Sequence, residues 1–358
     1  MRSEKVVVES FAKHIIQSAK EVGTSDIHIL PEKDIFGIYY RLGGRMARQY
    51  TVSEEEGTRL VSYFKYLASM DVGERRKPQS GSLVYELDVS DQDLRLSTIS
   101  NYQNQESLVI RLLEIQEEIS LAESTFLPHE LETLKRLVDY KSGLILFSGP
   151  VNSGKTTTMY QLIRNRMDEN QMQVISIEDP VEIKEERFLQ IQVNERAGNT
   201  YEESLKASLR HHPDAIIVGE IRDEETAKMV IRGALTGHLI IASVHAKNAE
   251  GVLTRLNELG ISFEMLRQTI IAIVFQKLLP IYCGICEGNC LVHCTHTPVN
   301  QKRASLYDVL SSEGIQKMSV HEDSITGRQR LRNFNQLLRK VYAYGFISEE
   351  TYYQYFIP

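Results

Sequence analysis

The chain has 358 residues, of which 42% are hydrophobic and 25% are charged, a composition typical of a folded protein of about two domains. Its 41 basic and 48 acidic residues give a net charge of -7, which argues against a protein whose whole surface binds nucleic acid. The longest apolar run, residues 270–275, is far shorter than the roughly 18 residues that a membrane crossing needs. The N-terminus lacks the apolar core of a secretory signal, so we expect a cytoplasmic protein.

Residues 1–115 predict a small α+β domain. Apolar residues recur every three or four positions over 6–22, which indicates an amphipathic helix that ends at Gly23. Three β-rich segments follow, and a Gly-Gly pair predicts a hairpin between the last two. Ser53 and Glu56 form a capping box that opens a second helix reaching to about residue 70. The segments "SLVYEL", "LRLSTIS" and "SLVIRLL" complete the domain as strands.

The rest of the chain has a different pattern. Residues 116–125 are polar and without a strong period, and we predict a linker there. Over 126–280, helical stretches alternate with short segments that are apolar throughout, among them "GLILFSG", "QVISIED", "AIIVGE" and "LIIASVH". Strands that are apolar on both faces indicate a parallel sheet covered by helices on each side. Residues 281–358 contain a cysteine cluster and then a helical C-terminal tail, whose last helix is predicted to start at Ser348.

The segment "GPVNSGKT" fits the pattern G-x-x-x-x-G-K-[ST] and lies between a predicted strand and a predicted helix. Its glycines allow backbone N–H groups to converge on phosphate oxygens, Lys155 reaches the β- and γ-phosphates, and the Thr156 hydroxyl binds Mg2+. We therefore predict a nucleotide site; the alternative is a glycine-rich turn of similar sequence. The candidate contacts are Gly149, Pro150, Val151, Asn152, Ser153, Gly154, Lys155, Thr156 and Thr157.

Two acidic segments follow predicted strands. "DAIIVGE" places Glu220 at the end of an apolar strand, an arrangement that holds Mg2+ and its waters. "EDPVE", residues 178–182, lies near the phosphate loop if the strands are parallel, and Glu178 is a further candidate nucleotide contact. A carboxylate there can polarise the attacking water. The alternatives are helix capping by Glu220 and a solvated acidic turn at 178–182.

These segments resemble the four boxes of the secretion ATPases that assemble type II secretion pseudopili and type IV pili. Walker A (149–156), the Asp box "IEDPVE" (177–182), Walker B "PDAIIVGEIRD" (213–223) and the His box "TGHLIIASVH" (236–245) occur in the family's order. The segments "SDIHILP", "ERRKPQSG" and "LRLSTIS" match the family's N-terminal domain, so the resemblance covers nearly the whole chain. It implies a RecA-like P-loop NTPase domain of α/β class, a small N-terminal α+β (PAS-like) domain and a helical C-terminal tail.

The resemblance also implies roles for individual residues. Lys155 and Thr156 would bind phosphate and Mg2+, Glu220 would coordinate through Walker B, and Glu182 would be the water-activating base. His238 or His245 would sense the γ-phosphate; the alternative for each is a satisfied core histidine.

The family brings arginines from its N-terminal domain onto the nucleotide, where a positioned positive charge stabilises the transition state. Arg41, Arg95 and Arg111 occupy the matching strand positions, and the alternative is that they are merely solvated. In Walker A, Val151 and Asn152 stand where the family usually has Thr-Gly. "SVHAKNA" differs from the usual second part of the His box, so only the histidine carries over securely.

The cysteines Cys283, Cys286, Cys290 and Cys294 fall within twelve residues. Four thiolates at this spacing suit one tetrahedral Zn2+; reduced cysteines without metal are the alternative. Assembly ATPases of the family often have two separated C-x-x-C pairs here, whereas this cluster is compressed.

The small size, the compressed cluster and the expected lack of an extra N-terminal docking module favour the competence branch of Gram-positive bacteria. For that branch the resemblance implies a ring hexamer at the inner face of the cell membrane, which hydrolyses ATP with Mg2+ and acts on a membrane platform protein and, through it, on pilin-like subunits for DNA uptake. No direct nucleic-acid contact is expected. The alternatives are a retraction ATPase of the same family, a RecA- or helicase-type nucleic-acid motor, which the negative charge disfavours, and a scaffold that binds ATP without cycling.

Overall fold

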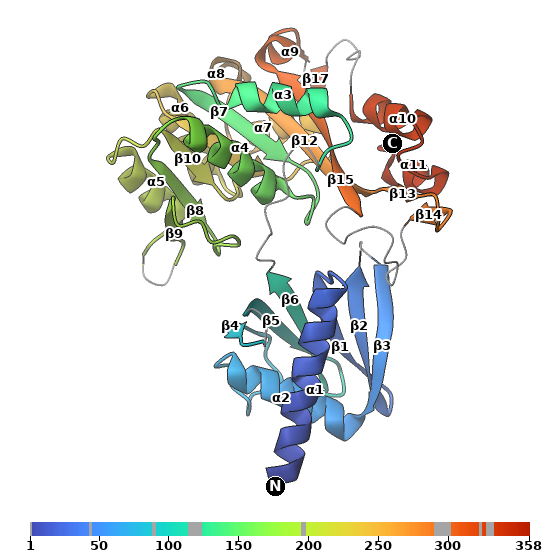
Figure 1. Ribbon diagram of the computed structural model, residues 1–358. Coiled ribbons are helices and arrows are strands. Elements are labelled where there is room, and N and C mark those ends of the chain that lie inside the picture. Colours follow the sequence, from blue (N-terminus) through green and yellow to red (C-terminus); the bar gives the residue numbers. More distant parts are fainter. Residues whose placement is uncertain are drawn as a thin grey trace. The chain divides into compact units, whose positions relative to one another are not determined.

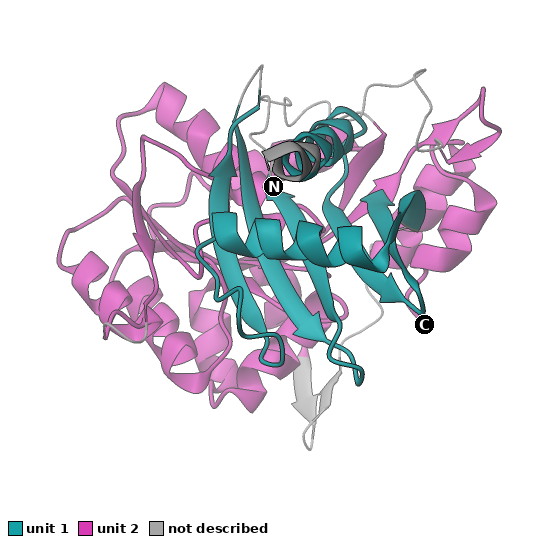
Figure 2. Cartoon of the chain, turned by 90° about the horizontal axis from the view of Figure 1, so that it is seen from below, with its two compact units in different colours: residues 1–118, 291–300 teal, residues 119–290, 301–358 magenta. Residues whose placement is uncertain are grey.

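The computed structural model describes residues 2–42, 45–87, 91–113, 124–194, 198–289, 302–321, 324–326 and 333–358. These residues form two compact units, one made of the described residues up to 113 and the other of those from 124 on (Figure 2). Most of the predicted linker lies outside the described residues. No helix in the described ranges combines the length and the apolar character needed to cross a bilayer.

The first unit is a six-stranded antiparallel sheet with two helices packed on one face (Figure 1). The helices are α1 (Arg2–Glu21) and α2 (Glu54–Leu67), and the strand order is β3-β2-β1-β6-β5-β4. The strands are β1 (Asp26–Glu32), β2 (Ile35–Leu42), β3 (Arg45–Ser53), β4 (Gln79–Tyr85), β5 (Gln92–Ser100) and β6 (Glu106–Leu113). The predicted capping box at Ser53 and Glu56 is confirmed, and α2 ends slightly before the predicted limit.

Alternation along the strands of the first unit explains why only one face is covered. Ile27 and Ile29 of β1 are buried in the core with Ile15 and Ile16 of α1, because successive side chains of a strand point to opposite faces. The other face carries polar residues, among them the predicted arginines.

The second unit contains a seven-stranded sheet in the order β15-β12-β7-β11-β10-β8-β9, parallel except for the antiparallel edge strand β15. Its strands are β7 (Gly143–Ser148), β8 (Val174–Glu178), β9 (Leu189–Gln192), β10 (Ala215–Val218), β11 (Leu239–Val244), β12 (Ile270–Pro280) and β15 (Arg303–Ser311). Two short pairs are separate: β13 (Tyr282–Cys283) with β14 (Gly288–Asn289), and β16 (Ser319–His321) with β17 (Ser324–Thr326).

Helices cover both faces of this sheet, as predicted (Figure 1). One face packs against α3 (Pro128–Leu137) and α4 (Lys155–Glu169), and the other packs against α5 (Tyr201–Leu209), α6 (Glu224–Leu235), α7 (Ala249–Glu258) and α8 (Phe263–Thr269). Leu144 and Leu146 of β7 face one core, whereas Ile145 and Phe147 face the other. This explains why the strand is apolar throughout.

The C-terminal part contains a strand that the sequence patterns did not predict. β15 pairs with β12 over its whole length, so residues beyond 280 complete the sheet. The short helix α9 (Ser312–Gln316) follows, and the predicted helical tail consists of α10 (Phe334–Ala343) and α11 (Glu349–Tyr355). The side chain of Ser348 caps α11, which confirms its predicted start.

Candidate nucleotide site

The phosphate loop connects β7 to α4 in a conformation that depends on particular residues. Gly149, Asn152 and Gly154 have φ angles of 147°, 62° and 81°. A Cβ added at Gly149 would lie 2.1 Å from the backbone oxygen of Gln276, so this position requires glycine. Asn152 stands where the family usually has glycine, and asparagine is one of the few other residues that tolerate the left-handed region.

The N-terminus of α4 fits a bound phosphate. Gly154 precedes the helix and supplies no side-chain cap, so the first-turn N–H groups are available to a ligand. The Ser153 hydroxyl is buried and has no hydrogen-bond partner among the described atoms. The Lys155 ammonium donates to the carbonyl oxygens of Gly149 at 3.1 Å and Pro150 at 3.0 Å.

Residues from all four boxes converge on this loop. The Thr156 hydroxyl donates to Glu182 Oε2 at 3.2 Å. His245 Nε2 lies 3.4 Å from Glu220 Oε1, and its Nδ1 lies 3.3 Å from the Gly149 oxygen. These residues follow β7, β8, β10 and β11, whose carboxyl ends meet at one edge of the parallel sheet.

The electrostatics of Lys155 reflect this convergence. Burial lowers the pKa of Lys155, while the nearby carboxylates of Glu220 and Glu182 raise it. The lysine therefore lies within the field of both acids. Hydroxyl and carboxylate oxygens are the ligands that Mg2+ prefers, so Thr156 and Glu220 fit magnesium, and Glu182 lies beside them.

Two residues at the site were missed by sequence reasoning. Arg222 Nε donates to Glu220 Oε2 at 2.8 Å, and its guanidinium lies 3.6 Å from Asp179 Oδ2. Arg222 thereby links Walker B to the Asp box. Its position two residues after Glu220 could have indicated from the sequence that it lies at the site. Gln276 lies beneath the loop, where its amide donates to the Thr158 hydroxyl at 3.0 Å; nothing in its apolar segment indicated this.

Two predicted residues lie elsewhere. Glu178 is only 3% exposed and accepts hydrogen bonds from Tyr160 and, at 2.8 Å, from Ser176. His238 immediately precedes β11, whereas His245 immediately follows it. A six-residue strand spans about 20 Å, so of these two histidines His245 is the one that lies at the phosphate loop of its own chain.

The three predicted arginines form one row across the sheet of the first unit. Asp26 of β1 pairs with Arg41 of β2 on one side and Arg111 of β6 on the other, and Arg111 pairs with Arg95 of β5. Residues directly opposite one another in antiparallel strands project from the same face. Arg111 Nε donates to Asp26 Oδ1 at 2.8 Å.

The cysteine cluster is only partly described. Cys283 is buried in β13 and Cys286 lies in the following turn, whereas Cys290 and Cys294 lie outside the described residues. Within the described ranges no three or more histidine, cysteine, aspartate or glutamate residues gather as a metal site.

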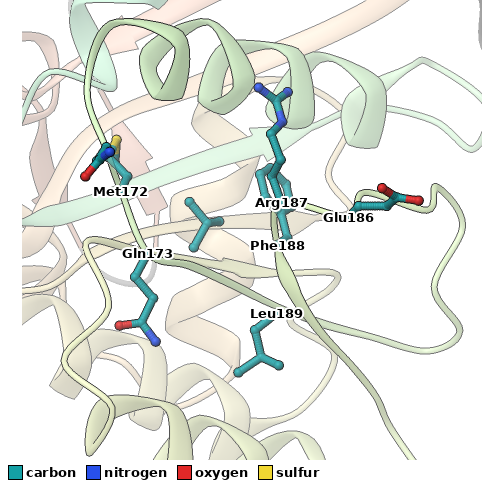
Figure 3. Close-up of a pocket in the computed structure, with 8 residues that line it drawn as sticks. Met172, Gln173, Glu186, Arg187, Phe188 and Leu189 are labelled. Carbon is teal, nitrogen blue, oxygen red and sulfur yellow. The ribbon is translucent and has the colours of Figure 1, made fainter.

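A hollow of about 560 Å³ lies at the amino ends of β8 and β9, away from the phosphate loop (Figure 3). Figure 3 shows Arg187 directed toward a helix, and its guanidinium pairs with Asp168 of α4 at 2.8 Å. None of the predicted site residues lines this hollow, whose lining is Gln171, Met172, Gln173, Val174, Glu186, Arg187, Phe188 and Leu189.

A glycine-rich loop between a buried parallel strand and a helix, with lysine, hydroxyl and carboxylates around it, defines the class of P-loop ATPases. More particularly, the chain belongs to the family described as "Type II/IV secretion system protein", whose model matches residues 2–351. The predicted family, fold class and ATPase activity are thereby confirmed.

Competence proteins are among the similar sequences. The chain is 39% identical to the competence protein ComGA of Bacillus subtilis over 346 residues, which are 96% of this chain and 97% of ComGA. It is 43% identical to ComGA of Streptococcus pneumoniae over 273 residues, 76% of this chain and 85% of that protein. The ATPase DotB of Legionella pneumophila shares the fold, with a TM-score of 0.72 at 19% identity over 96% of this chain and 95% of DotB.

Proposed function

We propose that the chain is an ATP-hydrolysing motor that powers the assembly of a type IV pilus-like pseudopilus during competence for DNA uptake. The similarity to ComGA over nearly the full length of both chains carries this proposal. A retraction ATPase of the same family shares the four boxes, but the similarity to the competence proteins favours assembly.

In the proposed site, each residue has a chemical task. Lys155 binds the β- and γ-phosphates, and Thr156 and Glu220 hold magnesium. Magnesium, when bound, neutralises charge on the phosphates. Glu182 orients the attacking water and takes its proton on the carboxylate, and the Thr156 hydroxyl would serve as a ligand of magnesium when the ion is bound. His245 Nε2 lies 3.4 Å from Glu220 Oε1, and His238, at the other end of β11, has no role at the phosphates.

The first unit contributes positive charge in this proposal. Arg41, Arg95 and Arg111 act on the developing negative charge of the transition state. Six chains form a closed ring, because domains that complete one another's sites favour cyclic assemblies.

The proposed place of action is the cytoplasmic face of the cell membrane. There the motor binds a polytopic platform protein and acts through it on pilin-like subunits, without binding nucleic acid itself. Zn2+ at the four cysteines would stabilise the segment beyond β12.

Turnover of two variants tests the activity. Glu182→Gln should bind ATP and magnesium with unchanged affinity, while kcat falls by about 100- to 10,000-fold. Lys155→Ala should lose binding. Equal ATP hydrolysis by the wild type and by Lys155→Ala would refute the proposed site.

Co-purification from membranes tests the partner. Glu182→Gln, stalled before hydrolysis, should retain a polytopic membrane protein more strongly than Lys155→Ala does. Retention of DNA instead, weakened by added salt, would favour the nucleic-acid motor.

A further inference from the structure

We infer that one face of α4 positions the catalytic loop, and that Tyr160 and Arg164 are positioning residues for ATP hydrolysis. This inference rests on the proposed function, in which Glu182 activates the water. The loop comprises residues 179–188, between β8 and β9, and is called the Asp-box loop below.

The contacts of α4 with this segment follow the helical repeat. Thr156, Tyr160 and Arg164 are spaced by four residues and therefore lie on one face of the helix. Each one bonds a different glutamate: Thr156 Oγ1 donates to Glu182 at 3.2 Å, Tyr160 Oη donates to Glu178, and Arg164 Nε donates to Glu185.

The Tyr160–Glu178 hydrogen bond, called the first anchor below, lies before Glu182 in the sequence. Tyr160 is 1% exposed and Glu178 is 3% exposed, so their hydrogen bond is shielded from water and gains strength. The backbone N–H of Glu182 also bonds the Glu178 carboxylate. Tyr160 therefore acts on the backbone of Glu182 through a single intervening side chain.

The Arg164–Glu185 pair, called the second anchor below, lies after Glu182 in the sequence. The Glu185 side chain is 8% exposed and lies between two arginines, since Arg187 Nε donates to its other oxygen at 3.0 Å. The Arg187 guanidinium in turn pairs with Asp168 at 2.8 Å, one further step of four along α4. These charge-assisted bonds fasten the end of the Asp-box loop to the same helix.

Gln190 ties the two anchors together. Its amide nitrogen donates to Tyr160 Oη at 2.9 Å and to the Ile183 oxygen at 2.8 Å, and its Oε1 accepts from the Glu185 N–H at 2.8 Å. Glu182 is exposed between buried Glu178 and buried Glu185. The backbone of Glu182 is thus fixed, while its exposed carboxylate lies beside Thr156 at the phosphate loop. Catalysis requires such preorganisation.

Kinetics of matched variants test the inference. In Tyr160→Phe and Arg164→Gln, kcat should fall by about 100-fold, the cost of a small misplacement, while KM and the affinity for magnesium ATP change less than about twofold. Arg164→Lys should recover part of the loss, because it keeps the charge but not the planar geometry. Amide hydrogen exchange in the Asp-box loop should accelerate in both deleterious variants.

Two controls alter contacts of the same helix that do not involve the Asp-box loop. Tyr307→Phe removes a buried hydroxyl 3.4 Å from the Thr158 hydroxyl, and Arg166→Gln removes a pair with Asp139. Both should keep kcat within about twofold. If Tyr160→Phe fails to fold, Arg164→Gln and Glu185→Gln still test the second anchor.

The outcomes separate the two proposals. If Glu182→Gln silences turnover but Tyr160→Phe and Arg164→Gln hydrolyse ATP normally, the inference is wrong and the proposed function stands. If Glu182→Gln itself keeps wild-type turnover, the proposed function fails and the inference fails with it. Equal losses in the controls would also overturn the inference, because they would indicate a general effect on α4.

Discussion

Arg111 donates through Nε to Asp26 at 2.8 Å, although Asp26 is 2% exposed and the Arg111 side chain is 41% exposed. The aspartate lies under the arginine row, between Arg41 and Arg111. The acid therefore holds the arginine in place while much of the guanidinium stays accessible to a ligand.

Loss of this arginine should lower turnover. In Arg111→Gln, kcat should fall by about a thousandfold if the arginine stabilises the transition state, and the melting temperature should also fall, because buried Asp26 loses its charged partner. Arg48→Gln is the matched control, since Arg48 forms an exposed pair with Glu32 at 2.6 Å in the same sheet. Similar kinetics for both variants would exclude the proposed role of Arg111.

Gly149→Ala should weaken nucleotide binding. The new Cβ would lie 2.1 Å from the Gln276 backbone oxygen and would impose a φ of 147° on an alanine, so the loop must change shape. We expect the Kd for magnesium ATP, measured by calorimetry, to rise at least about tenfold. Gly284→Ala meets nothing within 4 Å and should bind normally; unchanged affinity in Gly149→Ala would contradict the loop geometry.

Lys65 and Glu106 form a buried ion pair at 2.5 Å in the first unit, where Lys65 also donates to the Glu74 oxygen at 2.7 Å. Lys65→Met leaves Glu106 buried without its partner and should lower the free energy of unfolding by about 3–5 kcal/mol. Adding Glu106→Leu should restore most of it, as followed by urea denaturation.

An exposed pair provides the comparison for this prediction. Arg59 and Glu55 lie one turn apart on α2, and Arg59→Gln should cost no more than about 0.5 kcal/mol. If Lys65→Met costs equally little, the pair does not stabilise the unit as its burial suggests.

Zinc analysis of the purified full chain tests the cysteine cluster. About one zinc per chain is expected, with loss of the metal in Cys290→Ser and Cys294→Ser, because all four thiolates are needed for a closed tetrahedral site. Wild-type protein treated with a chelator under native conditions serves as the metal-free control. Absence of zinc from freshly purified protein would leave reduced cysteines as the correct alternative.

The sequence predicted the elements better than the contacts between them. Strands such as β7 were identifiable because both of their faces are buried, and Ser53 and Ser348 marked helix starts through capping. β15 was missed because the cysteine segment separates it in sequence from β12, the strand with which it pairs. No local pattern indicated that this return strand would complete the sheet.

For the site, the sequence likewise predicted the main residues but not all of their positions. Motif spacing identified Lys155, Thr156, Glu182 and Glu220, which the fold brings together. It could not distinguish the two ends of β11, and hence His238 from His245, nor assign Glu178 to the interior. The pairing of Arg164 with Glu185 joins segments that are distant in sequence, and periodicity does not reveal such packing.

Helix α4 begins at the phosphate loop and also carries the contacts to the Asp-box loop. The same helix therefore supports both the proposed phosphate-binding groups and the proposed base, Glu182. A tilt of α4 would shift the phosphate-binding amides and Glu182 together. Nucleotide binding and activation of the attacking water would then be lost in the same movement, so ATP would not be hydrolysed without productive motion.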